Sequence, residues 1–139
     1  MYNRYTIDNT IFKIAIYIRL SREDGDDMES ESVTNQRSLL NGYLKAQNLV
    51  AVDIYIDDGY TGTNFERPDF KRMLNDIEKG KINMVITKDL SRLGRDHIMT
   101  GYYVETYFPE NDVRYIAVND DIDTFYETSG SDMMPFKLS

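Results

Sequence analysis

The sequence predicts an α/β domain built on a mainly parallel sheet of four or five strands. Short apolar segments rich in isoleucine and valine alternate with segments of helical periodicity, and this alternation is typical of βαβ units. Unusual polar residues directly follow the apolar segments, at the expected carboxyl ends of the strands, where such sheets bind their ligands. The 139 residues provide for one hydrophobic core, so we expect one domain.

The first half of the chain is expected to form two strands and one helix. Residues 12–18 are almost continuously apolar and predict a strand that is covered on both faces. A polar, acidic loop should follow. Ser32 is expected to cap a helix that runs to about residue 48, with Gln36 on its apolar face. Residues 51–56 predict the second strand.

The second half is expected to add two helices and two strands. Pro68 suits a first helical position and Gly80 suits a helix stop, so we expect a helix between them. Residues 82–87 and 113–118 predict the third and fourth strands. Between these two strands, the segment LSRLGRD is expected to lead into a single helix that ends near Pro109.

The composition excludes several classes of site. The chain has no cysteine and one histidine, His97, so it can build neither a disulfide framework nor a Cys/His zinc site by itself. We expect no metal or other cofactor. No apolar stretch approaches the roughly 20 residues of a membrane-spanning helix, so we expect a cytoplasmic protein without a membrane partner. The net charge of −8 is unlike that of a module that holds nucleic acid alone.

A serine and an arginine are predicted to share one side of the first strand. Tyr17, Arg19 and Ser21 have the same parity, so their side chains point the same way if the extended backbone continues. Alternatively, Arg19 is an exposed cation at the end of the strand, and Ser21 is a helix cap or a loop hydroxyl. These residues considered alone favour that alternative.

Three further arginines stand at expected helix starts. Arg92 and Arg95 are three positions apart, which places both guanidinium groups on one face beside the positive end of the helix dipole, where anions bind. Alternatively, one of them pairs with Asp89 or Asp96. Arg67 falls near an N-cap, where Ser, Thr, Asp or Asn would stabilise the helix, so we expect another selective reason for it.

Two other polar residues have open interpretations. Gln36 requires a hydrogen-bond partner on its apolar helix face, and it either orients a phosphate or an arginine or satisfies a backbone carbonyl. His97 is expected to be a surface residue of a helix rather than a catalytic base.

Taken in order, these segments resemble the resolvase/invertase family of serine recombinases. The resemblance covers about residues 13–125 and depends on five elements: Tyr17-Ile-Arg19-Leu-Ser21, Gln36, Asp58-Gly-Tyr-Thr-Gly62, Arg67 and Leu90-Ser-Arg92-Leu-Gly-Arg95. The acidic loop and the sequences TGTNFERPDF and KDLSRLGRD are more similar to the large serine recombinases, the integrases and transposases of mobile elements. The resemblance implies a three-layer, resolvase-like domain of flavodoxin-like shape.

The resemblance also implies roles for individual residues. Ser21 would be the nucleophile that attacks a DNA phosphodiester. The cationic cage for that phosphate would comprise Arg19, Arg67, Arg92 and Arg95, and the supporting polar groups would be Tyr17, Gln36, Asp58 and Ser91. Small resolvases carry an aspartate at the position of Ser91, so the general acid is unassigned in this chain.

The resemblance further implies the partners and the domain organisation. The substrate would be DNA, and the full-length protein would act as a homodimer that pairs into a synaptic homotetramer. Residues 1–12 would be a lead-in, 13–125 the catalytic domain, and 126–139 a tail towards a dimerisation helix and DNA-binding domains outside this chain. Those domains would supply most of the DNA affinity, and the isolated chain is expected to be inactive.

Two other functions remain open from the residues alone. A magnesium-dependent nuclease would hold its metal with carboxylates from Asp57, Asp58, Asp120, Asp121 and Asp123. A non-enzymatic, flavodoxin-like signalling or binding module would instead use a pocket formed by Asp57, Asp58, Thr87 and Lys88.

Overall fold

A computed structural model describes residues 11–21 and 32–125, and it contains one five-stranded sheet. The strand order is β2-β1-β3-β4-β5, with the first four strands parallel and β5 antiparallel to β4. The strands are β1 (Ile14–Leu20), β2 (Asp53–Asp58), β3 (Met84–Thr87), β4 (Arg114–Ala117) and β5 (Ile122–Asp123). The predicted α/β class with a mainly parallel sheet is therefore confirmed.

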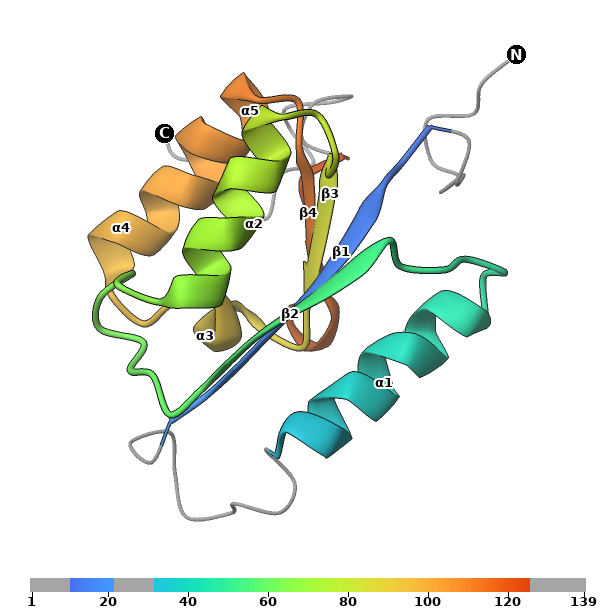
Figure 1. The fold of residues 1–139 in the computed structure, drawn as a ribbon, viewed down its shortest axis with the longest axis horizontal. Helices are drawn as coiled ribbons and strands as arrows, with labels where there is room; N and C mark the ends of the chain where they lie inside the picture. The colour runs from blue at the N-terminus through green and yellow to red at the C-terminus, as the bar shows by residue number, and fades with distance from the viewer. Residues whose placement is uncertain (1–10, 22–31, 126–139) are drawn as a thin grey trace.

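Helices cover both faces of the sheet and complete three layers (Figure 1). One face is covered by α1 (Val33–Lys45). The other carries α2 (Pro68–Glu78), the short α3 (Leu90–Leu93) and the helical stretch of α4 (His97–Tyr102), a π-helical turn (Tyr103–Tyr107) and α5 (Phe108–Glu110). None of the helices within the described ranges is both long and apolar enough to cross a bilayer.

The alternation of side chains along β1 separates two apolar cores. Ile14, Ile16 and Ile18 pack in the cluster that includes Leu40 and Leu44 of α1. Ala15 and Tyr17 belong to the cluster on the opposite face, together with α2 residues such as Phe70. Because strand side chains alternate with a period of two, Arg19 lies on the same face as Tyr17, below α2 and α3.

The two long helices begin as the sequence predicts. Ser32 caps α1, and its hydroxyl accepts a hydrogen bond from the Asn35 backbone N–H at 3.1 Å. The helix ends at Lys45, three residues before the predicted end. Pro68 is the first residue of α2, and Gly80 adopts a positive φ of 77° just after that helix, as expected for a glycine at a helix stop.

The prediction of one continuous helix from the LSRLGRD segment to Pro109 is wrong. The chain forms α3, leaves the helical conformation at Gly94 with φ −177° and ψ 159°, and starts again at α4 with Asp96 as a new N-cap. A side chain at Gly94 would place its Cβ 2.3 Å from the Phe65 ring and 2.5 Å from the Thr100 hydroxyl. Close tertiary packing therefore sets the position of this break, and helical periodicity cannot reveal it.

The predictions of the individual strands did not include β5. Its two residues are too few for a periodic pattern, and the strand is held by the buried Arg114 of β4. Arg114 donates from Nε and Nη2 to the Asp123 carboxylate at 2.9 and 2.6 Å. Asp123 is thus part of an ion pair at the edge of the sheet.

Candidate active site

Arg19 lies at the carboxyl end of β1 and is fully buried, with 0% of its surface exposed. Its guanidinium donates to three main-chain carbonyls: Nε to Arg92 at 3.3 Å, Nη1 to Tyr60 at 3.1 Å, and Nη2 to Ser91. The interpretation of Arg19 as an exposed strand-end cation is therefore wrong. These contacts hold a buried positive charge between the end of β1 and α3.

The carbonyl oxygen of Arg19 accepts hydrogen bonds from two other predicted site residues. Gln36 of α1, which is also fully buried, donates from Nε2 to this oxygen at 3.0 Å. Arg92 of α3 donates to it from Nη1 at 3.4 Å. This hydrogen bond agrees with one of the interpretations left open for Gln36, the satisfaction of a backbone carbonyl, and that carbonyl is two residues before Ser21.

Arg67 is the second fully buried arginine of the site. Its Nη1 donates to the Leu93 carbonyl at 2.6 Å and to the Tyr17 hydroxyl at 3.2 Å. Its Nε donates to the Asn64 carbonyl at 3.0 Å. At the N-cap of α2, the Arg67 side chain makes no capping hydrogen bond. As predicted from the unusual residue type, helix capping is not the reason for an arginine here.

The C-terminal end of α3 brings these arginines together. The carbonyls of its last three residues accept hydrogen bonds from the guanidinium groups of Arg19 and Arg67. Such carbonyls lack partners within a helix, and cations stabilise this negative end of the helix dipole. The predicted placement of Arg92 and Arg95 at the start of one helix is wrong, because Arg92 lies in the last turn of α3 and Arg95 lies beyond it.

Arg95 joins the cluster through Gly62. The Arg95 backbone N–H donates to the Gly62 carbonyl at 2.7 Å. A Cβ on Gly62 would lie 2.7 Å from Nη2 of Arg19 and 2.8 Å from Cγ of Arg95, so both side chains pack on this glycine. The side chain of Arg95 is exposed.

Arg92 also approaches an acidic side chain. Its Nε lies 3.9 Å from Oδ1 of Asp89, which agrees with the alternative in which one of these arginines pairs with Asp89 or Asp96.

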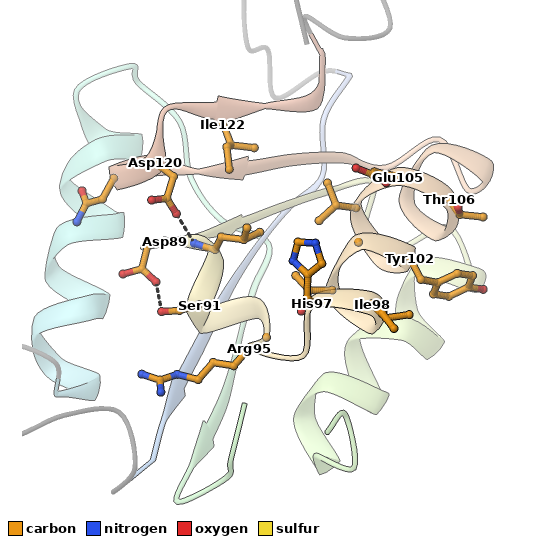
Figure 2. Close-up of a pocket in the computed structure, with 16 residues that line it drawn as sticks. Asp89, Ser91, Arg95, His97, Ile98, Tyr102, Glu105, Thr106, Asp120 and Ile122 are labelled. Carbon is orange, nitrogen blue, oxygen red and sulfur yellow. Dashed lines mark hydrogen bonds between the residues drawn. The ribbon is translucent and has the colours of Figure 1, made fainter. Parts of the chain in front are cut away.

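The remaining predicted residues surround the same strand ends. Ser21 directly follows β1 and is 3% exposed. Asp58 lies opposite Leu20 at the end of β2, and its side chain is exposed. The Ser91 hydroxyl hydrogen-bonds to Oδ1 of Asp89 at 2.6 Å (Figure 2).

Tyr17 links Arg67 to a carboxylate that the sequence analysis did not assign to this site. The Tyr17 hydroxyl donates to Oδ2 of Asp57 at 2.9 Å. Burial raises the pKa of Tyr17, and the neighbouring Arg67 offsets part of that shift. Asp57 has the same parity as Tyr55 in β2, and both are buried, whereas Asp58 is exposed. This alternation is the sequence signal that could have separated Asp57 from Asp58.

The carboxylates proposed for a magnesium site do not come together. Asp57 and Asp58 end β2, whereas Asp120 and Asp121 lie between β4 and β5, and Asp123 lies in β5, at the other edge of the sheet. Asp120 accepts a hydrogen bond from the Leu90 N–H at 2.6 Å. Within residues 11–21 and 32–125, no group of three His, Cys, Asp or Glu side chains could hold a metal ion. The set proposed for the nuclease is therefore not supported.

The pocket proposed for a signalling module is not formed either. Thr87 is buried, and its hydroxyl bonds to the Asp89 carbonyl at 2.8 Å and the Tyr115 hydroxyl at 2.7 Å. Thr87 lies on β3 and Asp57 lies on β2, and β1 runs between these two strands.

An open groove of about 1490 Å³ begins beside Ser91 and Arg95 and continues between α4 and β5 (Figure 2). His97 and Glu105 line its wall. Burial raises the pKa of Glu105, and His97 offsets part of the shift. His97 is exposed on the first turn of α4, as predicted for a helix surface residue.

Comparison with known proteins identifies the family. Residues 14–137 match the family described as "Resolvase, N terminal domain". The chain belongs to this family. A solved structure described as the N-terminal catalytic domain of TP901-1 integrase is 34% identical and superimposes with a TM-score of 0.73, over 85% of each chain. The predicted resemblance to the resolvase/invertase family, and to its integrases, is confirmed.

Two further relatives extend this comparison. A protein named "Putative DNA recombinase" from Bacillus subtilis (strain 168) is 31% identical over 76% of this chain, and the match spans only 20% of that relative. A resolvase family site-specific recombinase from Streptococcus pneumoniae is 24% identical, with a TM-score of 0.65 over 87% of each chain. At that identity, the likeness supports the resolvase-like fold alone.

Proposed function

We propose that this chain is the catalytic domain of a serine site-specific recombinase, in which Ser21 attacks a DNA phosphodiester. The observation that carries the proposal is that Arg19 and Arg67 both donate to carbonyls at the end of α3, next to the strand that leads into Ser21. Arg92 bonds to the Arg19 carbonyl, and Arg95 packs beside Arg19 on Gly62. Membership of the resolvase family and the likeness to an integrase catalytic domain support the same function.

The proposed chemistry uses electrostatics in place of an adjacent base. A serine hydroxyl is a weak nucleophile, and its usual activator is a neighbouring histidine. The one histidine of this chain, His97, is exposed on α4. Preorganised guanidinium groups can stabilise the serine alkoxide and the charge that develops on the phosphate oxygens, and loss of one such donor typically costs about 3 to 4 kcal/mol.

Cleavage would conserve the energy of the phosphodiester. The Ser21 hydroxyl loses its proton and its oxygen forms a bond to phosphorus, while the bond from phosphorus to the 3′ oxygen of the DNA breaks and that oxygen takes up a proton, so the reaction consumes no net proton. The products are a phosphoserine ester to the DNA 5′ end and a 3′ hydroxyl, and the reverse reaction rejoins a strand without ATP. Because Ser21 is 3% exposed, its hydroxyl must become accessible before DNA can reach it.

The proposed organisation of the full-length protein follows the family. We propose that residues 13–125 form the catalytic domain, and that segments beyond this chain provide a dimerisation helix and DNA-binding domains. This division suits a net charge of −8, which opposes tight DNA binding by the chain alone. The working unit would be a homodimer that pairs into a synaptic tetramer, in the cytoplasm.

A covalent trapping experiment tests the proposed function without knowledge of the recombination site. The full-length protein is expressed in its source organism, the cells are lysed rapidly in detergent, and DNA fragments covalently attached to the protein are captured and sequenced. We expect fragments with a common end, attached to Ser21 as a phosphoserine ester that mass spectrometry identifies.

The first prediction concerns the nucleophile. Ser21→Ala should abolish the covalent adduct, because the attacking oxygen is absent, and it should leave the circular dichroism spectrum and thermal unfolding of the protein essentially unchanged. Ser38→Ala removes an exposed hydroxyl on α1 and should retain the adduct. An adduct formed by the Ser21→Ala protein would refute the assignment of the nucleophile.

A further inference from the structure

Asp57 is a buried carboxylate at the end of β2, and its hydrogen-bond partners lie next to Arg67. It is 1% exposed. Its oxygens accept hydrogen bonds from the Tyr17 hydroxyl and from the backbone N–H groups of Asp69 and Phe70, each at 2.9 Å. Those two N–H groups belong to the first turn of α2. Asp57, on the neighbouring strand β2, therefore caps this helix, which the Arg67 side chain does not cap.

The hydrogen bond between Tyr17 and Asp57 determines how the Tyr17 hydroxyl is oriented towards Arg67. The Tyr17 hydroxyl is the donor, and Oδ2 of Asp57 is the acceptor. The lone pairs of the phenol oxygen then face Arg67, whose Nη1 donates to that oxygen at 3.2 Å. Asp57 therefore fixes both the backbone of Arg67, through the start of α2, and its guanidinium, through Tyr17.

The guanidinium of Arg67 is held by several contacts, and one of its donor atoms, Nη2, has no hydrogen-bond partner among the described residues. Besides Tyr17, it donates to the carbonyls of Asn64 and Leu93, and its Cζ lies 4.3 Å from the centroid of the Phe65 ring. Its Nη2 is buried and has no hydrogen-bond partner among the described residues. A buried donor without a partner is costly, which suits an atom that receives an anionic oxygen during the reaction.

We propose that Asp57 is a positioning residue, which acts through Tyr17 to hold the Arg67 guanidinium so that Nη2 is presented to an oxygen of the scissile phosphate. This inference rests on the proposed recombinase function. Asp57 does not touch the DNA, and its contribution is the orientation of a charge that does. An arginine with a rotating guanidinium would lose orientation at each encounter with the phosphate.

Three variants separate positioning from helix capping. Tyr17→Phe removes the link from Asp57 to Arg67 and leaves both backbone hydrogen bonds of Asp57 in place. Asp57→Asn weakens the link and the cap together. Asp53→Asn is the matched control, because Asp53 also connects β2 to α2, through a 2.9 Å ion pair with Arg72, but does not contact Tyr17 or Arg67.

The first readout is the mobility of the Arg67 side chain, measured by ¹⁵N NMR of its guanidinium in the full-length protein without DNA. In the parent protein we expect slow rotation of the terminal NH₂ groups and separate Nη signals. Tyr17→Phe and Asp57→Asn should speed this rotation and merge the signals. Asp53→Asn should leave the signals as they are.

The second readout is the rate of covalent adduct formation. Tyr17→Phe and Asp57→Asn should each lower the rate by at least about tenfold, because a misplaced catalytic group is costly. The double variant should be no slower than Asp57→Asn alone, since both residues act through one chain of contacts. Asp53→Asn should react at the parent rate.

Unchanged Arg67 signals in both site variants would overturn the inference. Additive losses in the double variant would also overturn it, because they would assign Asp57 to capping and Tyr17 to a separate role. Failure of the proposed function gives a different result: the parent protein forms no adduct, while Arg67 still becomes mobile in the Tyr17→Phe and Asp57→Asn proteins. That result rejects the reaction and upholds the placement of Arg67 by Asp57.

Discussion

Gly62 illustrates how one residue without a side chain can position two with long ones. The Arg19 guanidinium and the Arg95 stem both occupy the space that a Cβ at residue 62 would need. Gly62 is not among the glycines with positive φ, so its importance at this position is steric rather than conformational. This close approach places two arginines of the proposed phosphate cage beside one backbone segment.

The second prediction follows from this packing. Gly62→Ala should displace the Arg19 guanidinium, because the new methyl carbon would lie 2.7 Å from Nη2. We expect the rate of adduct formation to fall by at least about a hundredfold, in line with the misplacement of a catalytic group by about 1 Å. Quantification of the covalent adduct over time measures this effect.

Gly42→Ala is the control for the same change of side chain. Gly42 lies within α1, and a Cβ there would meet no atom within 4 Å. Alanine should stabilise that helix by about 0.5 to 1 kcal/mol and leave the adduct rate unchanged. A Gly62→Ala protein that reacts as fast as the Gly42→Ala protein would show that Arg19 is not held as described.

At the scale of elements, the break between α3 and α4 allows the arginines to converge. If the helix continued through Gly94, the carbonyls of α3 would bond to N–H groups of the next turn. The break leaves the carbonyls of Ser91, Arg92 and Leu93 to accept from Arg19 and Arg67 instead. An interrupted helix thus provides acceptors for two buried guanidinium groups.

The third prediction concerns the packing that accompanies this break. Gly94→Ala should destabilise the protein by about 1 to 3 kcal/mol, a typical cost of overpacking, because its Cβ would lie 2.3 Å from the Phe65 ring. Urea unfolding measures the change. Gly101→Ala, within α4, should instead be neutral or stabilising, since its Cβ would come no closer than 3.9 Å to Glu105. Equal stability of the two variants would contradict this account of the break.

For the whole molecule, buried tyrosines predict a loss of stability at alkaline pH. Burial is the largest cause of the raised pKa of Tyr17 and of Tyr115, both of which are 0% exposed. In the unfolded chain their pKa values return to about 10. The folded state therefore binds more protons than the unfolded state above that pH, and the free energy of unfolding falls as pH rises.

The fourth prediction gives the size of this effect. Above about pH 10, each such tyrosine should lower the free energy of unfolding by about 1.4 kcal/mol per pH unit, until the pH reaches its folded pKa. Urea unfolding between about pH 8 and pH 11 measures the slope. Tyr17→Phe should give a shallower slope than the parent protein, and identical slopes would contradict the assigned contribution of Tyr17.

Sequence periodicity was informative where burial follows a simple repeat. The isoleucines at alternate positions in β1 and the apolar face of α2 predicted those elements, and Ser32 and Pro68 predicted where two helices begin. The separation of α3 from α4 and the strand β5 could not be predicted, because four or two residues carry no measurable period. Individual side chains stabilise these elements instead. Asp89 accepts a hydrogen bond from the Arg92 N–H at the start of α3, and Asp123 of β5 pairs with Arg114 of β4.

The sequence by itself determined the fold class, the family and the residue types of the proposed site, since these depend on local pattern and on the order of motifs. Only the tertiary structure decided how the arginines are held and that Asp57, rather than Asp58, supports one of them. The physical reason is that each buried guanidinium takes part of its orientation from carbonyls and hydroxyls that are distant in sequence. The bond between Arg67 and Tyr17, for example, joins residues that are 50 positions apart.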